Sequence, residues 1–309
     1  MVNQVIVVSH LTKKFGDLSA VDNISFEIQE GEVFGILGPN GAGKTTTIRM
    51  LTGVISPMSG EISILNQSMP RDAVAIREKI GVLPETANVY GDLTGIQNLH
   101  LYGKLYGLGK KAMSERSENL LREMSLYEQR NQIAKTYSKG MKQRLSLAMT
   151  LMSQGQILFL DEPTSGLDPK SALQIRGVIS SLAASQRTIL LTTHNMKEAE
   201  ELCDRVAIMN HGRIAAIDTP GNLRSAFQER QSVVIEFSNA PDMDEIRSIS
   251  GVNEVTSTGS RVRCYASDPG EVLIQLVNLA RKNRLRILHA QTESASLEDV
   301  FLDLTKEGE

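Results

Sequence analysis

One stretch, GPNGAGKTT at residues 38–46, constrains this chain more than any other part of its sequence. It matches the pattern G-x-x-x-x-G-K-[ST] and follows the apolar run VFGIL, which predicts a buried strand. Its three glycines allow the backbone to curl tightly, so that successive N–H groups point inward. The next segment predicts a helix from Lys44 to about Leu51, whose positive dipole end favours an anion. We expect a phosphate-binding loop, with a glycine-rich turn that binds nothing as the alternative.

The polar residues that close this stretch suit the chemistry of a nucleoside triphosphate. Lys44 supplies a positive charge for the β- and γ-phosphates of a nucleotide. The hydroxyl of Thr45 can ligate Mg²⁺. The sequence therefore predicts a nucleotide and Mg²⁺ at the start of this helix.

A second candidate part of the site is the segment ILFLDEPTSGLDP. Its four apolar residues predict a buried strand, which delivers Asp161 and Glu162 to its C-terminal end, where sites in parallel sheets form. Asp161 suits Mg²⁺ as a hard oxygen ligand. Glu162 can polarise an attacking water. An acidic surface turn is the alternative, which the phosphate-binding loop elsewhere in the chain disfavours.

A histidine, His194, ends the predicted strand RTILLTTH. At the C-terminal edge of a parallel sheet it would lie on the same rim as Lys44 and Asp161, within reach of a γ-phosphate or the attacking water. A structural histidine is the alternative. The remaining histidines have no comparable neighbours in the sequence and receive no role: His10, His100, His211 and His289.

The order of the predicted elements indicates two domains. Strands and crossover helices alternate through the first part, which predicts an α/β domain with a parallel sheet over residues 1–222. Polar helical segments at about 89–145 predict an inserted helical subdomain, and RVAIMNHGRIAAID predicts a hairpin. Residues 230–309 follow the order βαββαβ, a small ferredoxin-like α+β domain, and end in a helix.

Composition excludes several classes of partner and location. The net charge of −3 gives no general attraction to nucleic acid, and we expect no nucleic-acid partner. Cys203 and Cys264 fit no metal spacing and suggest a reducing compartment. The N-terminus lacks the pattern of a signal peptide, and no apolar run approaches the ~18 residues that span a bilayer. We therefore expect a soluble chain, with any membrane role exercised through a partner.

The segment YSKGMKQRL, residues 137–145, contains no residue suited to acid–base chemistry. It predicts an exposed Ser-x-Gly turn followed by the start of a helix. A serine hydroxyl, free backbone amides and a helix dipole form an anion site that is incomplete until a phosphate arrives. A plain helix cap is the alternative.

Taken together and in order, these motifs resemble the ATP-binding cassette (ABC) ATPases over about residues 5–220. The matching segments are Phe15, GPNGAGKTT, GVLPE, YSKGMKQ, LFLDEP, SGLD and His194. The resemblance implies an α/β, P-loop NTPase fold of the ABC ATPase type with an inserted helical subdomain. It also implies that ATP is bound by the loop residues Gly38, Asn40, Gly41, Gly43, Lys44, Thr45 and Thr46, and that Mg²⁺ is bound with it by Thr45 and Asp161.

The same resemblance implies a homodimer in which two ATPase domains pack head to tail. Ser138 and the Gly140 backbone would then bind the γ-phosphate that the partner's loop holds, and Asp168 would contact the partner. Phe15 would stack on adenine, and Glu85 would help to bind Mg²⁺.

Two segments depart from the usual pattern of this family. The signature motif Leu-Ser-Gly-Gly-Gln reads Tyr-Ser-Lys-Gly-Met here, so that Lys139 replaces the first glycine and Met141 the glutamine. Glu85 stands where the family has glutamine. Both variants, and the C-terminal segment LEDVFLDLT, resemble an exporter branch that moves drugs, sodium or polysaccharides through a separate membrane subunit.

The resemblance implies a Mg²⁺-dependent ATPase that drives export through an integral membrane permease. It would be cytoplasmic and lie on the inner face of the membrane through the permease, with Glu162 and His194 as its catalytic residues. Two other readings stay open. One is a soluble cassette ATPase acting on ribosomes, DNA or metal-cluster assembly, and the other is a module that binds ATP without hydrolysing it. The cargo belongs to the membrane partner, so this sequence does not identify it.

Overall fold

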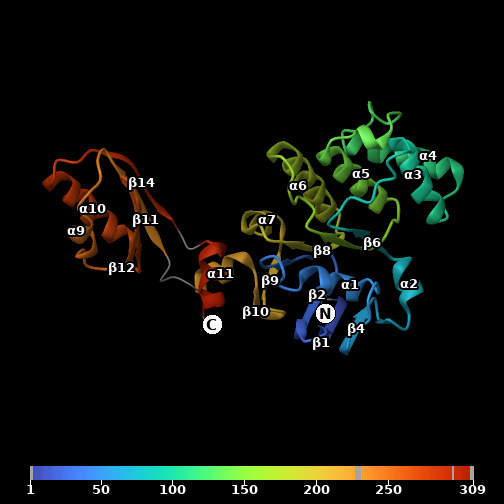
Figure 1. Ribbon diagram of the computed structural model, residues 1–309, viewed down its shortest axis with the longest axis horizontal. Helices are drawn as coiled ribbons and strands as arrows, with labels where there is room; N and C mark the ends of the chain where they lie inside the picture. Colours follow the sequence, from blue (N-terminus) through green and yellow to red (C-terminus); the bar gives the residue numbers. More distant parts are fainter. Residues whose placement is uncertain (1–2, 227–230, 294–295, 307–309) are drawn as a thin grey trace. The chain divides into compact units, whose positions relative to one another are not determined.

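The computed structural model describes residues 3–226, 231–293 and 296–306 of the chain (Figure 1). Contacts divide the chain into two compact units, residues 1–218 and 219–309. The domain limits expected at 222 and 230 stay predictions, and residues 227–230 lie outside the described ranges. Within those ranges, no helix is both long and apolar enough to cross a bilayer.

The first unit is built on a six-stranded sheet with the order β10-β9-β3-β8-β7-β6. All neighbouring strands are parallel except β9 and β10. Every residue of β3, β7 and β8 is buried, as expected of strands that are covered on both faces. The strands are β3 (Val33–Leu37), β6 (Ile80–Leu83), β7 (Ile157–Asp161), β8 (Thr188–Thr193), β9 (Arg205–Asn210) and β10 (Arg213–Asp218).

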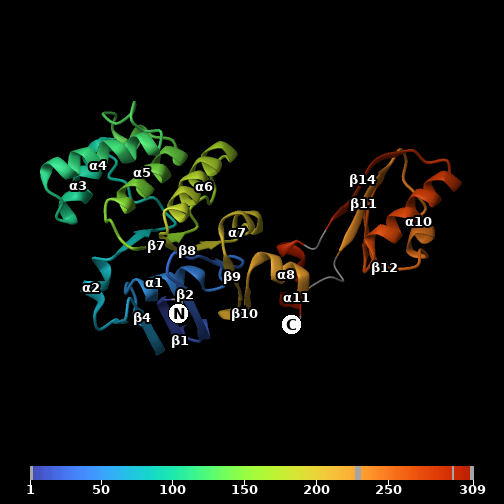
Figure 2. The same cartoon turned by 180° about the vertical axis from the view of Figure 1, so that it is seen from behind.

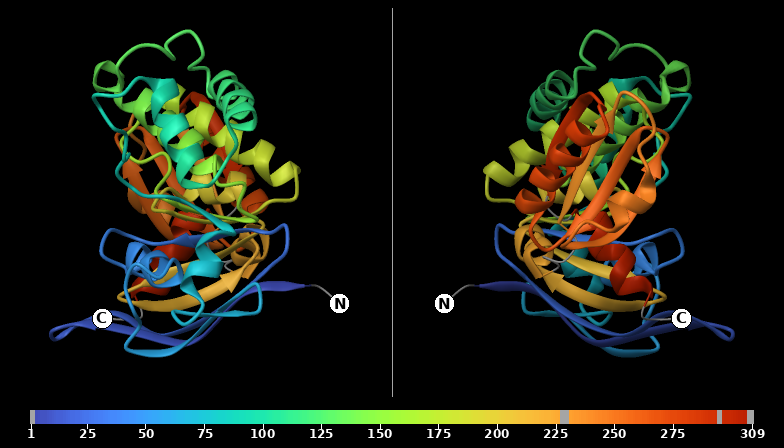
Figure 3. Two further views of the ribbon diagram at one scale, coloured as in Figure 1. Left: turned by 90° about the vertical axis from the view of Figure 1, so that its right-hand side faces the viewer. Right: turned by 90° about the vertical axis from the view of Figure 1, so that its left-hand side faces the viewer.

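A second, antiparallel sheet with the order β2-β1-β4-β5 packs on the first. Figure 3 shows its two longest strands, β1 and β2, as a twisted dark blue ribbon. One apolar cluster joins both sheets and the helix α1, and it includes the stacked rings of Phe26 and Phe34, 5.4 Å apart. The elements are β1 (Gln4–Phe15), β2 (Leu18–Gln29), β4 (Ser59–Ile64), β5 (Gln67–Met69) and α1 (Lys44–Leu51).

Helices α3, α4 and α5 pack on one another and gather at one end of the first unit (Figures 1 and 2). A capping box between Thr94 and Gln97 begins α3, and Ser138 caps α5. The short α2 was not expected from the sequence. The helices of this unit are α2 (Ala73–Arg77), α3 (Gly95–Leu105), α4 (Lys110–Glu123), α5 (Lys139–Leu151), α6 (Pro169–Ala184) and α7 (Met196–Leu202).

The second unit contains a four-stranded sheet with the order β12-β13-β11-β14, in which all neighbouring strands are antiparallel. Helices α9 and α10 alternate with the strands in the expected βαββαβ order, which is that of a ferredoxin-like fold. The elements are α8 (Pro220–Ala226), β11 (Ser232–Phe237), α9 (Met243–Arg247), β12 (Val252–Thr258), β13 (Arg261–Ala266), α10 (Pro269–Lys282), β14 (Ile287–Glu293) and α11 (Leu297–Lys306).

Packing between the two sheets of the first unit can be tested at Phe34, which is fully buried and stacks on Phe26. We expect Phe34→Ala to lower the free energy of unfolding by about 3–5 kcal/mol, because it leaves a cavity between the sheets. Urea titration followed by circular dichroism measures the change. The exposed Leu173 on α6 provides a control, since Leu173→Ala removes an apolar side chain that is not in the core. Equal shifts for the two variants would contradict this account of the core.

Candidate functional site

A pocket of about 600 Å³ lies between the β1–β2 hairpin and the loop that precedes α1. It brings together parts of the chain that are far apart in sequence, and it includes most of the predicted loop residues. Its lining residues are Phe15, Leu18, Ser19, Ala20, Pro39, Asn40, Gly41, Gly43, Lys44, Thr45, Thr46, Glu85, Glu162 and His211. Phe15 is half exposed beside this pocket, so the face of its ring is available to a ligand.

The loop takes its shape from glycines at which a side chain would be strained or would collide. Gly41 and Gly43 have φ angles of +85° and +109°, which residues with a Cβ rarely adopt. Gly38 packs against the backbone of Met209 at the end of β9, where a Cβ would lie 3.3 Å from its carbonyl carbon. Gly43 directly precedes α1, so the loop delivers its N–H groups at a helix N-terminus.

Lys44 and Glu162 form a buried ion pair at the base of the pocket. The ammonium nitrogen lies 3.0 Å from Glu162 Oε1, and the two side chains are only 5% and 7% exposed. Lys44 also donates hydrogen bonds to the carbonyl oxygens of Gly38 at 2.7 Å and Pro39 at 3.1 Å. Each buried charge is therefore offset by the other, which is the condition for burying either.

The carboxylate of Asp161 and the hydroxyl of Thr45 lie next to each other at the pocket. The Thr45 hydroxyl donates to Asp161 Oδ1 at 3.1 Å, and Thr192 Oγ1 donates to the same atom at 2.6 Å. A carboxylate and a hydroxyl on adjacent elements are the hard ligands that Mg²⁺ prefers when phosphates and waters complete its shell. The residues present fit a magnesium ion bound with a nucleotide, and Glu85 adds a further carboxylate to the pocket.

Glu162 is held in an unusual backbone conformation. Its φ of +48° is in the left-handed region, which is uncommon outside glycine and clusters at functional sites. Its N–H donates to both the carbonyl and the hydroxyl oxygen of Thr192, at 3.1 and 3.0 Å. His194 Nδ1 lies 2.7 Å from Glu162 Oε2, and the histidine side chain is 48% exposed. Lys44, Glu162 and His194 thus form one continuous chain of contacts, with Glu162 at its centre.

The predicted residues Ser138, Gly140 and Asp168 lie together, but they are not among the residues that line this pocket. Ser138 caps α5 by accepting a hydrogen bond from the Met141 N–H at 3.2 Å. Asp168 caps α6 by accepting from the Ser171 N–H at 3.0 Å, and its hydrogen bonds to Ser171 hold the pKa of this carboxyl below its ordinary value. Gly140 packs on Ser171, where a Cβ would lie 2.7 Å from the Cβ of that serine.

His211 lines the pocket, although no motif in the sequence indicated a role for it. It occupies the β9–β10 turn with Gly212, and both have positive φ, as expected of a tight hairpin turn. The Gly212 N–H donates to the carbonyl of Ala42 at 3.0 Å, and the Gly212 carbonyl accepts from the Asp22 N–H at 2.8 Å. The first bond attaches the turn to the phosphate-binding loop, and the second attaches it to β2. The His-Gly turn signal was visible in the sequence, whereas its contact with a distant loop was not.

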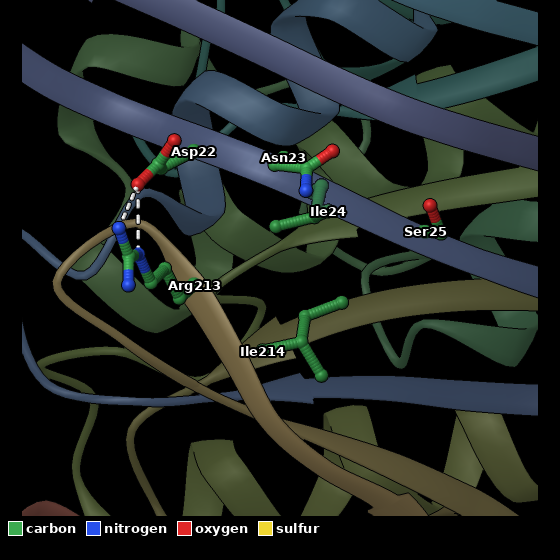
Figure 4. Close-up of a pocket in the computed structure, with 6 residues that line it drawn as sticks. All are labelled: Asp22, Asn23, Ile24, Ser25, Arg213 and Ile214. Atoms are coloured by element: carbon green, nitrogen blue, oxygen red, sulfur yellow. Dashed lines mark hydrogen bonds and ion pairs between the residues drawn. The ribbon is translucent and has the colours of Figure 1, made fainter.

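A second pocket, of about 500 Å³, lies between β2 and β10 (Figure 4). Its charged lining residues are Asp22 and Arg213, and the guanidinium donates to the Asp22 carboxylate at 2.7 Å. The other described lining residues are Asn23, Ile24, Ser25 and Ile214. Its described lining residues all lie on strands β2 and β10 and include no helix N-terminus, so this pocket offers a phosphate less than the pocket around Lys44 does.

The shape of the loop can be tested with two glycine variants that differ in one respect. Both Gly41→Ala and Gly43→Ala place a side chain at positive φ, which costs about 1–3 kcal/mol of strain. Only at Gly43 does the new methyl group collide, with the Ala20 carbonyl and with Met209 Cε at 2.7 Å. We expect Gly43→Ala to abolish the rise in melting temperature that ATP causes and Gly41→Ala to retain part of it. Equal losses in thermal-shift measurements would contradict the role given to the collision.

Comparison with known proteins bears directly on this site. A family model described as "ABC transporter" matches residues 21–165, which include the phosphate-binding loop, the segment YSKGM and the Asp161-Glu162 pair. A model described as "ATP-binding protein DrrA1-3-like, C-terminal domain" matches residues 219–305. Both units of the chain therefore match known families of ATP-binding proteins.

Similar proteins match over nearly the whole chain. A protein named Nod factor export ATP-binding protein I from Ralstonia nicotianae is 36% identical over 97% of this chain and 94% of its own length. The linearmycin resistance ATP-binding protein LnrL of Bacillus subtilis is 34% identical over 96% of each chain.

Solved structures resemble a large part of this chain in fold. The ATP-binding subunit of an ABC transporter is 30% identical with a TM-score of 0.66, covering 72% of this chain and 93% of its own. A dimeric, post-hydrolysis ATP-binding cassette bound to ADP and Pi is 25% identical with a TM-score of 0.64, covering 69% of this chain and 98% of its own. These comparisons confirm the predicted fold class, and they show that the chain belongs to the family of ABC transporter ATP-binding proteins.

Proposed function

We propose that this chain is the ATP-hydrolysing subunit of an ABC exporter, and that it works as a homodimer on a separate membrane permease. The observation that carries the proposal is the contact chain from Lys44 through Glu162 to His194 at the pocket. It combines a cation for phosphate, a carboxylate for water and an imidazole that orients the carboxylate.

In this proposal different parts of the pocket bind the phosphates and the adenine ring of ATP. The backbone N–H groups of the loop and the Lys44 ammonium bind the β- and γ-phosphates, which take the place of Glu162 as the partner of the cation. Phe15, exposed at the pocket, stacks on the adenine ring. Thr45, Asp161 and Glu85 would hold Mg²⁺. When bound, this ion neutralises charge on the phosphate oxygens as the terminal phosphoryl group is transferred.

Glu162 and His194 act on the attacking water. The Glu162 carboxylate accepts a proton from the water or aligns it, and its strained backbone directs the side chain toward the pocket. His194 holds Oε2 of this carboxylate and presents its other ring nitrogen for the γ-phosphate. Each residue directly follows one of two neighbouring parallel strands, β7 and β8, so the sheet restricts the distance between them.

The second cluster, Ser138, Gly140 and Asp168, acts across the dimer in this proposal. These residues do not line their own chain's pocket, although they lie at the N-termini of α5 and α6, where a phosphate is favoured. A similar cassette is dimeric in its post-hydrolysis structure. Lys139, which stands where the family has glycine, lies against Gly166 and adds a positive charge beside this cluster.

The export role is supported by the relatives, whose names refer to Nod factor export and linearmycin resistance. The match extends through the C-terminal unit, so the likeness is not confined to the ATPase. Export through a separate permease would hold the chain on the cytoplasmic face of the membrane. The cargo is a property of the permease.

The central test of the mechanism is Glu162→Gln. This variant keeps the shape of the side chain but removes its charge, so that it can no longer accept a proton from water. We expect kcat for ATP hydrolysis to fall by about 100-fold or more, while ATP produces a stable dimer in size-exclusion chromatography with light scattering.

Lys44→Ala is the matched comparison, because it removes the cation that binds phosphate. It should show neither hydrolysis nor an ATP-dependent dimer. Near-normal turnover by Glu162→Gln would remove Glu162 from its role. A monomeric Glu162→Gln protein that still binds ATP would contradict the homodimer.

The transporter role is tested by what the chain binds in its own cell. Tagged Glu162→Gln protein is used with ATP to recover partners from detergent-solubilised membranes, since slow hydrolysis should prolong the closed state. We expect a stoichiometric polytopic membrane protein, and much less of it with Lys44→Ala. Recovery of only ribosomes, nucleic acid or soluble proteins would instead support a soluble cassette ATPase.

A further inference from the structure

Glu198 on α7 is a buried carboxylate that lies behind the site and outside the pocket. It is only 1% exposed, and both of its oxygen atoms accept hydrogen bonds from hydroxyl groups. Thr164 Oγ1 donates to Oε1 at 2.8 Å, and Thr193 Oγ1 donates to Oε2 at 2.6 Å. A carboxylate in this position thus connects two threonines that are 29 residues apart in sequence.

Each threonine belongs to a segment that carries part of the proposed site. Thr164 follows Glu162 by two residues and lies on the loop that leads to Asp168. Thr193 directly precedes His194 at the end of β8, and its carbonyl accepts from the Gly38 N–H at 3.3 Å. The Glu198 carboxylate therefore connects two segments. One contains the proposed general base Glu162 and the proposed dimer contact Asp168, and the other contains His194.

The cost of burying this carboxylate indicates that its position matters. Burial raises the pKa of Glu198 above its ordinary value, and the bonds from Thr193 and Thr164 work in the opposite direction. The negative charge of Glu162 also raises the pKa, so the two carboxylates are close enough to interact. An apolar side chain on α7 would avoid this cost but would leave both hydroxyl groups without their acceptor.

We propose that Glu198 is a positioning residue for ATP hydrolysis, which fixes the Thr164 loop relative to His194. This inference rests on the proposed function. The Ser165 N–H donates to the Glu162 carbonyl at 3.1 Å, and the Leu167 N–H donates to the Thr164 carbonyl at 3.3 Å. Displacement of this loop at a dimer contact is therefore transmitted to Glu162 through the chain and to His194 through Glu198. The carboxylate couples closure at Asp168 to alignment of the hydrolytic pair.

Steady-state ATPase assays of four single variants test this role. Glu198→Ala removes the acceptor, Glu198→Gln retains a carbonyl acceptor, and Thr164→Val removes one donor while preserving shape. Glu201→Gln is the matched control, because it removes a negative charge from the exposed end of the same helix, where Glu201 pairs with Arg176. The double variant Glu198→Ala with Thr164→Val completes the set. Affinity for a fluorescent ATP analogue and melting temperature are measured for each.

We expect Glu198→Ala to lower kcat by about tenfold or more, since displacement of reacting groups by about 1 Å can cost a hundredfold in rate. KM and affinity for the analogue should stay within about twofold of wild type, because Glu198 does not line the pocket. Glu198→Gln should recover part of the loss. In the double variant, Thr164→Val should add little, because both changes break the same connection. Glu201→Gln should behave as wild type.

The outcomes separate this inference from the proposed function. A wild-type chain that binds ATP without hydrolysing it, alone and with its membrane partner, would overturn both. A wild-type chain that hydrolyses ATP, with Glu198→Ala retaining its kcat, would overturn the positioning role alone. If Glu198→Ala does not fold, Thr164→Val decides: an unchanged kcat in that variant overturns the role. A loss of affinity equal to the loss of kcat would also do so, because it would indicate general damage to the site.

Discussion

The parallel pairing of β3, β8 and β7 determines where the phosphate-binding loop, the Asp161-Glu162 pair and His194 lie. Leu37 pairs with Thr193, and Asp161 pairs with Thr192, so the three strands end at nearly the same level. The phosphate-binding loop, the Asp161-Glu162 pair and His194 follow these strand ends directly, and they therefore meet at one edge of the sheet. The fully buried strands make this arrangement rigid, because a slip in their pairing would disrupt the core on both faces.

Much of this arrangement could be predicted because its signals are local. The run VFGIL and the helix that follows it were expected where β3 and α1 are found, since strand, glycine-rich loop and helix follow one another in the chain. The prediction that Lys44, Asp161 and His194 lie on one rim followed from a single rule, that the carboxyl ends of parallel strands lie at the same edge of a sheet. The βαββαβ order of the second unit was readable for a similar reason, because its periodicity changes clearly at each turn.

What the sequence concealed depends on contacts between distant segments. The hydrogen bond from Gly212 to Ala42 joins the β9–β10 hairpin to a loop about 170 residues earlier. The sequence of neither segment indicates that the two are in contact. The hydrogen bonds from Thr164 and Thr193 to Glu198 could not be predicted either, because a glutamate on a polar helix is normally exposed to solvent. The left-handed conformation of Glu162 also arises from its surroundings, namely the two bonds that its N–H makes with Thr192.

The site concentrates buried carboxylates around a single buried ammonium, and this imbalance accounts for its dependence on the surrounding framework. Asp161, Glu162 and Glu198 are all buried, and Glu162 is the one of the three that forms an ion pair with Lys44 among the described residues. Threonine hydroxyls stabilise the other two, because they donate hydrogen bonds to the carboxylates without adding charge. Hydroxyl groups leave the excess negative charge in place, and it would attract a divalent cation to Asp161. A lysine or arginine in place of these threonines would stabilise the carboxylates more strongly, but it would weaken the electrostatic attraction for that cation.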